Sequence, residues 1–557
     1  MTTRSTPGGG GYVPKPYPAT AQYRRLRAPP EDRAVLVEPP FEKVAAVVEE
    51  NIRLRAGRDY DFSGCSLAEL SAQARRELLR EARRWVSAYR DVDSSAADQA
   101  GLIFLAGHQP ELFHPGVWLK NFALGTLARR HGAVAINLLI DSDTVRGTAL
   151  RVPGGSPSEP QVETIPFDLA EPRIPYELRR IVDCRMFADC GRRVAQQIAP
   201  LISDPLIEDY WPLVQRRMQQ TDNLGACLAQ ARHQLEGQWG LQTWEITQSR
   251  ICESEPFCRF VAHLLARLPQ LWRAYNEVLR EYRRVHHTRS TTHPVPDLGV
   301  DRQWLEAPLW VYSAEDPHRR RLFARPCGDQ ILLSDRNHLE IGLPLTPEGD
   351  ASRAVERLGE LRRQGVKIRS RALITTLYAR LVLGDLFLHG IGGAKYDQVT
   401  DLLMERLFGL QPPAFVVLSA TLHLPIERQR GDIEQSRAIR QELRRLVYHP
   451  ERYIDAVNGD RAENRSYPAE LIAEKARWVK TPQTSQNARN RCRVIRRINQ
   501  ALQPWVDGRR GQLLQLQAQA TRALRAEELL ACRDYAFCLY PEKTFRGFLQ
   551  GLLPKSA

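Results

Sequence analysis

The sequence predicts an α/β protein built on a doubly wound parallel sheet, with helical insertions and a C-terminal helical hairpin or coiled coil. Two strand-helix-strand patterns, near residues 102–140 and 386–419, predict the sheet. Long amphipathic stretches at 175–285 and 426–531 predict the helical parts. The chain has 557 residues and is 43% hydrophobic, enough for two or three domains of roughly 100–200 residues each.

The first half of the core is predicted within residues 41–174. Residues 1–40, rich in Gly, Pro and Arg, predict a flexible leader before it. Residues 66–89 have helical spacing, and Ser66 and Glu69 form a capping box at the start. A strand at 102–106, a helix from Gly116 and a continuously apolar strand at 133–140 follow. A strand apolar along its whole length is typical of a parallel sheet buried on both faces.

The remaining segments alternate between helical and mixed character. Residues 175–300 predict a helical insertion, and 301–425 predict antiparallel strands (305–345) followed by the second half of the core. That half comprises a strand at 386–389, a Gly-rich turn, a helix at 394–407 and a strand at 412–419. Residues 426–531 predict a helical hairpin or coiled coil, with a plain helical domain as the alternative, and 532–557 form a C-terminal segment.

The net charge of +14 has two interpretations. It is typical of the Arg-rich composition that a GC-rich genome encodes, and it also suits an anionic partner such as a nucleotide, a carboxylate substrate or nucleic acid. Nucleic-acid binding is a minor hypothesis, because no sequence signature of a nucleic-acid-binding module accompanies the basic residues.

Neither a membrane partner nor a metal is predicted. No stretch approaches the ~20 uncharged apolar residues of a membrane span, and the N-terminus has no apolar signal-peptide region. We therefore expect a cytoplasmic protein. The ten cysteines include no Cys-x-x-Cys pair and none at zinc-finger spacing, so there is no metal signature.

Polar clusters follow three of the predicted strands. Because ligands bind beyond the carboxyl ends of strands in an open α/β sheet, we expect these clusters to converge on one face. They are Gly107-His108-Gln109 with His114, then Asp141-Ser142-Asp143, then His389-Gly390-Ile391-Gly392-Gly393.

Each cluster has a chemical and a structural interpretation. Gly107-His108 precedes a helix, whose N-terminus attracts anions, but a lone His at a strand end is often structural. Asp141 or Asp143 could hold Mg²⁺ or an amine, act as a base, or cap a turn. The glycines of the third cluster let a backbone approach a ligand closely. The first turn resembles that of class I synthetase-like nucleotidyltransferases, whose second signature, a Lys-Met-Ser-Lys-Ser loop, has no match in this sequence.

In this order the clusters resemble the bacillithiol biosynthesis cysteine-adding enzyme family. The family's Thr-Gly-Gln-Gln-x-Gly-Leu turn corresponds to AGHQPELF (106–113), and its Asp-His-Asp to Asp141-Ser142-Asp143. Its Gly-Gly-Pro-Gly-Glu-x-x-Tyr segment corresponds to HGIGGAKY (389–396), followed by the strand FGLQPPAFVVLS (408–419) and a helical region. The resemblance covers about residues 95–530.

The resemblance implies a Rossmann-like core with a coiled coil, and ligation of L-cysteine to the amine of glucosaminyl malate, a small anionic substrate. A nucleotide cofactor and a homodimer through the hairpin are left open. The implied catalytic residues are His108, Asp141 and Asp143. The implied binding residues are Gly107, Gln109, His114, His389, Gly390, Gly392, Gly393 and Tyr396.

The departures from the family pattern include His108, Glu111, Ser142 and Gly393. Most glycines that determine the backbone persist while polar side chains change, which indicates a retained fold with an altered site. The alternative from a different class is a non-catalytic binding or scaffold protein on a nucleotidyltransferase-like core.

Overall fold

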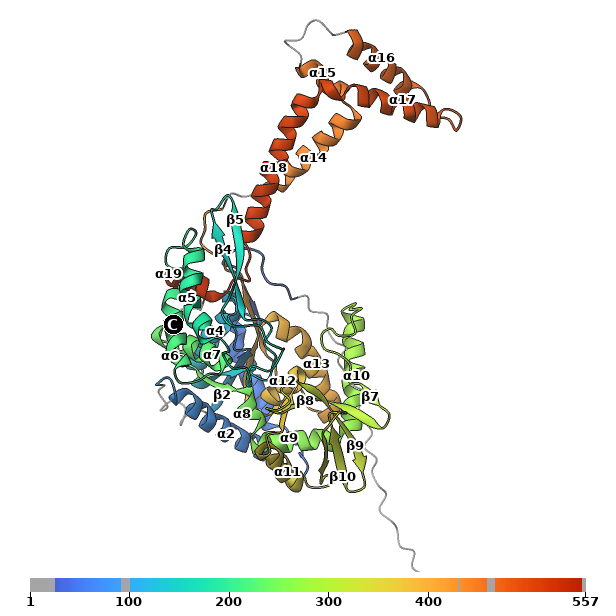
Figure 1. The fold of residues 1–557 in the computed structure, drawn as a ribbon. Coiled ribbons are helices and arrows are strands. Elements are labelled where there is room, and N and C mark those ends of the chain that lie inside the picture. Colours follow the sequence, from blue (N-terminus) through green and yellow to red (C-terminus); the bar gives the residue numbers. More distant parts are fainter. Residues whose placement is uncertain (1–25, 92–100, 429–430, 458–465, 553–557) are drawn as a thin grey trace, which may run out of the picture.

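The computed structural model describes residues 26–91, 101–428, 431–457 and 466–552. It is a mixed α/β structure with a large body and a helical arm that projects from it (Figure 1). The body is organised around a six-stranded sheet in the order β1-β14-β13-β2-β3-β6. These strands are β1 (Val35–Glu38), β2 (Leu102–His108), β3 (Ala133–Leu139), β6 (Trp244–Thr247), β13 (Leu386–His389) and β14 (Val416–Ala420).

Five of the six strands are parallel, and β1 pairs antiparallel with β14 at the edge. The chain adds β3 and then β6 on one side of β2, and later returns to add β13 and β14 on the other side. The direction of winding therefore reverses between β2 and β13. The predicted parallel sheet is confirmed.

Helices cover both faces of this sheet. On one face α1 (Val44–Ala56) and α4 (Pro115–Arg130) pack against Phe104 and Ala106 of β2. On the other face Ile103 and Leu105 join the largest apolar cluster. The helices that contribute to that cluster include α2 (Leu67–Ser87), α12 (Ala372–Tyr378), which continues into a π-helical turn (Ala379–Leu383), and α13 (Ile391–Phe408).

Local signals in the sequence determine several element ends. The capping box at the start of α2 is present: Ser66 Oγ accepts from the Glu69 backbone, and the Glu69 carboxylate accepts from Ser66 N. Helix α13 begins earlier than predicted, at Ile391, so Gly392 and Gly393 lie in its first turn. Neither glycine has a positive φ, so a tight turn does not account for them.

The region predicted as a helical insertion contains one strand of the core. Strand β6 lies within it and pairs with β3, so the segment predicted as a helical insertion also supplies a strand of the core sheet. Its four residues are all buried, and so short a run carries no readable periodicity. The helices are α5 (Cys184–Ile198), α6 (Ile207–Met218), α7 (Leu224–Gln238), α8 (Gln248–Cys252), α9 (Glu255–Ala266) and α10 (Leu268–Val285).

A second sheet, entirely antiparallel, confirms the strands predicted at 305–345. Its strands are β7 (Val300–Asp301), β8 (Trp304–Tyr312), β9 (Arg320–Cys327), β10 (Gln330–Ser334), β11 (Glu340–Leu343) and β12 (Lys367–Ser370), with α11 (Ser352–Arg363) between the last two. A separate hairpin is formed by β4 (Ala149–Gly155) and β5 (Pro160–Pro166).

The predicted leader ends earlier than residue 40, because 35–38 form β1 and complete the core sheet. A four-residue edge strand is too short to stand out from a Pro- and Arg-rich context. Residues 1–25 of that segment lie outside the described residues.

The arm is formed by the predicted helical hairpin. Its helices are α14 (Ile433–Tyr448), α15 (Glu451–Val457), α16 (Ser466–Lys480), α17 (Ala488–Ala501) and α18 (Asp507–Leu530). Helices α14 and α18 lie side by side, and the others form the tip (Figure 1). The chain then returns to the body and ends in α19 (Glu542–Leu552). Within the described ranges, no helix combines the length and apolarity needed to cross a membrane.

Candidate functional site

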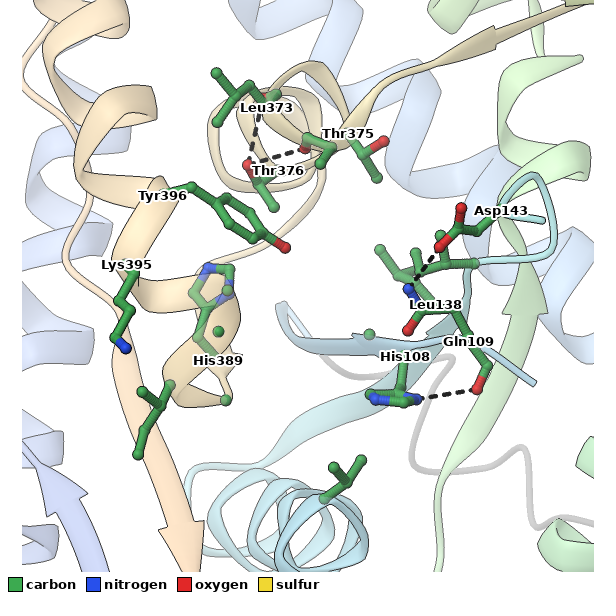
Figure 2. A pocket seen from close by; sticks show the side chains of 18 of the residues that line it. His108, Gln109, Leu138, Asp143, Leu373, Thr375, Thr376, His389, Lys395 and Tyr396 are labelled. Carbon is green, nitrogen blue, oxygen red and sulfur yellow. Dashed lines mark hydrogen bonds between the residues drawn. The ribbon is translucent and has the colours of Figure 1, made fainter. Parts of the chain in front are cut away.

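A crevice of about 850 Å³ lies at the carboxyl ends of the core strands, where the winding reverses between β2 and β13. Figure 2 shows its two walls, with His108, Gln109 and Asp143 facing His389, Lys395 and Tyr396 across open space. All the predicted site residues line it except Asp141. They are Gly107, His108, Gln109, His114, Asp143, His389, Gly390, Gly392, Gly393 and Tyr396.

Two helices begin at the crevice. Helix α4 follows β2 and is capped by His114, and α13 follows β13 with Gly390 as its N-cap residue. Both run back along the sheet, so their positive ends point to the same space. The first turn of α13 also presents free backbone N–H groups, whereas in α4 Pro115 has no N–H and those of Gly116 and Val117 already donate to His114. This arrangement is favourable for an anionic group.

The glycines of α13 differ in what surrounds them. A Cβ atom added to Gly390 or Gly392 meets nothing within 4 Å, so both are open to the crevice. A Cβ on Gly393 would lie 2.7 Å from Nδ1 of His389. Gly393 is therefore required for the position of His389, whereas Gly390 and Gly392 leave room for a ligand.

His108 is uncharged at neutral pH. Burial lowers the pKa of its imidazole to about 3, and Nδ1 lies 3.1 Å from the carbonyl oxygen of Gln109. Because that carbonyl can only accept, Nδ1 carries the proton and Nε2 is the acceptor. The ring also packs edge-on against Phe113, with centroids 5.0 Å apart. His108 can therefore accept a proton or a hydrogen bond, but it does not bind an anion as a cation.

His114 has a structural task. Its Nδ1 accepts a hydrogen bond from Gly116 N at 3.1 Å, which caps α4, and burial lowers its pKa to about 4. The side chain lines the crevice as a neutral group. Of the three crevice histidines, His114 is the one whose position is explained by helix capping.

His389 forms a buried dyad with a residue that the sequence analysis missed. Its Nε2 lies 2.7 Å from the carboxylate of Asp397, one helical turn beyond the glycines, and Arg380 forms an ion pair with the same carboxylate at 2.7 Å. Arg380 and His389 hold the pKa of Asp397 below its usual range despite burial. Burial lowers the pKa of His389, which leaves a neutral ring whose Nδ1 lies beside Gly393.

The two aspartates after β3 face different cavities. Asp143 lines the crevice, where it accepts from Gln109 Nε2 at 2.9 Å and forms an ion pair with Arg319 at 3.1 Å. Asp141 was expected in the same place and is not there. It accepts from the backbone N and Oγ of Ser249 at the start of α8, at 2.9 and 2.5 Å, and lines a smaller cavity of about 270 Å³. Residues two apart follow different paths once the strand has ended.

Lys120 is the second residue that the sequence analysis missed. It lies in the second turn of α4, is 4% exposed and lines the crevice. Its ammonium donates to the carbonyl of Gly107 at 2.9 Å, and no carboxylate of the described residues forms an ion pair with it. Burial lowers its pKa to about 8. A charged residue within the apolar run Val117–Ala123 was the available signal.

The charge around the crevice is predominantly positive. Besides Lys120, it is lined by the cationic residues Arg27, Arg146, Arg319, Arg371, Lys395 and Arg533, against the carboxylates of Glu111 and Asp143. Burial raises the pKa of Glu111. This balance favours an anionic ligand.

The described residues contain one group with the spacing of metal ligands, and it lies outside the crevice. It comprises His233, Glu236 and Glu245, all buried. Arg232 forms ion pairs with both carboxylates, so a guanidinium already supplies the positive charge there. The chemistry of this group therefore favours a structural ion-pair network over a metal site.

No protein-family model matches the chain, and a search of curated proteins finds no match.

Proposed function

We propose that the protein is an enzyme with a Rossmann-like core that forms an amide bond between L-cysteine and the amine of a small anionic sugar conjugate such as glucosaminyl malate. The observation that carries the proposal is the crevice itself, where two helix N-termini, Lys120 and two neutral histidines meet at a reversal of winding. The motif resemblance in 106–113 and 389–396 supplies the reaction class.

The sheet supports the Rossmann-like part of the proposal. Counted along the chain, the parallel strands lie in the order 5-4-1-2-3, which read from the other edge is the 3-2-1-4-5 order of dinucleotide-binding folds. In such folds the phosphate of a ligand sits at a helix N-terminus beside the first strand. Here that position is the start of α4, next to Gly107 and Lys120.

Amide formation needs a base and an activated carboxyl. His389 is the base in this proposal, because Asp397 fixes the proton on Nε2 and leaves Nδ1 as the acceptor. The amine attacks the activated carbonyl, loses its proton to His389 and forms the C–N bond as the activating group leaves. A nucleoside triphosphate is the class of co-reactant that would activate the carboxyl, with its phosphates at the helix N-termini.

The proposal is tested by following the amide product. The purified full-length chain is incubated with L-cysteine, glucosaminyl malate and a nucleoside triphosphate, and the condensed thiol is measured by mass spectrometry. His389→Ala should abolish the product. The matched control is His449→Ala, which removes a half-exposed histidine of the arm and should leave the product unchanged.

Two results would contradict this function. The wild-type chain could yield no condensed thiol under any nucleotide, or a deletion strain could keep an unaltered thiol profile. Either would leave the alternative, a binding or scaffold protein that uses the arm, as the better account. The cytoplasmic location and the dimer through the arm belong to the same proposal and are tested by fractionation and sedimentation.

A further inference from the structure

The part of the crevice that lies beside the second sheet carries an arginine with unused donors. We call this the arginine end and define it by Tyr275, Val295, Trp310, Arg319 and Arg371, all of which line the crevice. It is built from α10, the loop after it, β8, the residue before β9, and the turn from β12 into α12. Arg371 is the N-cap residue of α12, and its side chain makes no capping hydrogen bond.

The partners of Arg371 pair with only one of its three guanidinium nitrogens. Its Nη1 forms an ion pair with Glu306 at 2.7 Å, and the group stacks over Trp310 with Cζ 4.0 Å from the ring centroid. The residue is only 9% exposed. Nε and Nη2 are buried and have no hydrogen-bond partner in the part of the chain that the structure describes.

Those two nitrogens form the side-on fork of the guanidinium, with parallel N–H bonds that match the two oxygens of a carboxylate. Leaving buried donors unpaired costs about 1–3 kcal/mol for each group. Folded proteins rarely keep such donors without a partner. Glu306 and Trp310 hold this fork within a residue that lines the crevice, so a ligand that reaches it would complete its hydrogen bonds.

The charge balance at this end specifies the kind of anion. Glu306 also pairs with Arg321, at 3.3 Å, so one carboxylate serves two guanidinium groups and one positive charge is in excess. Arg319, the other crevice arginine over Trp310, is already paired with Asp143. A single carboxylate neutralises the excess, whereas a phosphate dianion would overcompensate it in this buried place.

We infer that the fork of Arg371 binds a carboxylate group of the substrate in the crevice. This rests on the proposed function, in which both L-cysteine and the malate moiety carry carboxylates. Arg371 is then a specificity-determining residue: it positions the substrate and takes no part in bond formation.

Direct binding tests the inference without requiring turnover. L-Malate and its uncharged analogue malamide are titrated into the full-length chain by calorimetry, with inorganic phosphate as a second probe. Wild type should bind L-malate and not malamide. Arg371→Gln should weaken L-malate binding roughly 10- to 100-fold, as expected for two charge-assisted hydrogen bonds. Phosphate binding should be unchanged in this variant and lost in Lys120→Met.

Two further variants separate recognition from folding. Arg371→Lys keeps the charge and loses the fork, and should weaken L-malate binding nearly as much as Arg371→Gln. Arg321→Gln removes the second arginine on Glu306 but keeps the fork of Arg371, so it should weaken L-malate binding less than Arg371→Gln does. Equal L-malate affinity in wild type, Arg371→Gln and Arg371→Lys, or no binding to wild type, would overturn the inference. L-Malate binding that depends on Arg371 in a chain without ligase activity would contradict the proposed function alone.

Discussion

Replacing Lys120 by Met should make the protein more stable while removing its anion site. Lys120 is buried and lacks a carboxylate partner among the described residues, so its ammonium is held without a neutralising charge. Met matches the length of the lysine stem and carries no charge. The same change at a lysine that serves the fold would destabilise it, so the sign of the effect distinguishes the two roles.

The magnitude follows from the pKa of Lys120, which burial lowers from 10.5 to about 8. The unfolded chain binds this proton more tightly than the folded one, so at pH 7 the charged form costs the fold about 3 kcal/mol. The hydrogen bond to Gly107, worth roughly 1.5 kcal/mol, offsets part of this. Lys120→Met should therefore raise the free energy of unfolding by about 1 to 2 kcal/mol at pH 7.

The pH dependence gives the decisive measurement. Above pH 8 the folded wild type loses the proton, so its penalty declines by roughly half or more by pH 9.5, and the advantage of Met shrinks accordingly. Urea denaturation followed by tryptophan fluorescence measures the difference at both pH values. The matched control is Lys475→Met in the arm. Lys475 is equally buried but paired with Glu451 at 2.6 Å, so its loss should destabilise by about 3 to 5 kcal/mol.

A destabilised Lys120→Met at pH 7, or a difference that does not change with pH, would refute this reasoning. Lys120 would then be a structural donor that holds Gly107 in place. Stabilisation together with loss of phosphate binding is expected if the lysine is kept for a ligand.

Four other substitutions test the crevice and its surroundings. Gly392→Ala should fold normally and reduce anion affinity by filling open space at the start of α13, whereas Gly393→Ala should displace His389 and lose activity. Equal behaviour of the two variants would argue against separate roles for these glycines in ligand binding and in positioning His389. His108→Ala should abolish turnover or ligand binding and change the free energy of unfolding by less than about 1 kcal/mol; loss of folding would make it a structural residue. Asp141→Asn should leave ligand binding in the crevice intact. Burial and the charge of Glu177 raise the pKa of Asp141 to about 7, so its ionisation destabilises the folded wild type as pH rises from 4 to 7. The variant should therefore show a flatter dependence of the free energy of unfolding on pH over this range, and an unchanged dependence in denaturation at several pH values would contradict the reasoning.

The strand ends could be predicted because they depend on local pattern. The apolar runs at 102–106, 133–140 and 386–389 fixed three strands, and the polar residues after them had to meet if the strands were parallel. Strand β6 escaped because four buried residues have no periodicity. The placement of Asp141 and Asp143 in different cavities could not be predicted either, because it depends on the path of the chain after the strand has ended.

The residues that the sequence analysis missed are those whose importance lies in partners far along the chain. Asp397 is recognisable only beside His389 and Arg380. Lys120 and Arg371 look like ordinary basic residues among 79, and nothing in the neighbouring letters separates them from arginines that pair on the surface. They differ from those arginines in three dimensions only, because each is buried with a charge or hydrogen-bond donors that the surrounding residues do not fully pair.

The unpaired charge of Lys120 and the unpaired donors of Arg371 are the strongest structural support for ligand binding by this protein. A folded chain has no reason to bury an ammonium without a carboxylate, or a guanidinium fork without an acceptor, when Met or Leu would pack there at lower cost. Both residues line the same cavity: Lys120 has no carboxylate partner among the described residues, and Arg371 shares Glu306 with Arg321 and keeps two unpaired donors. Under the proposed function, these residues would hold two anionic groups of one ligand, one at Lys120 and one at Arg371. His389, whose ring is fixed by Asp397, also lines this cavity, so the proposed base and the two cations line the same space.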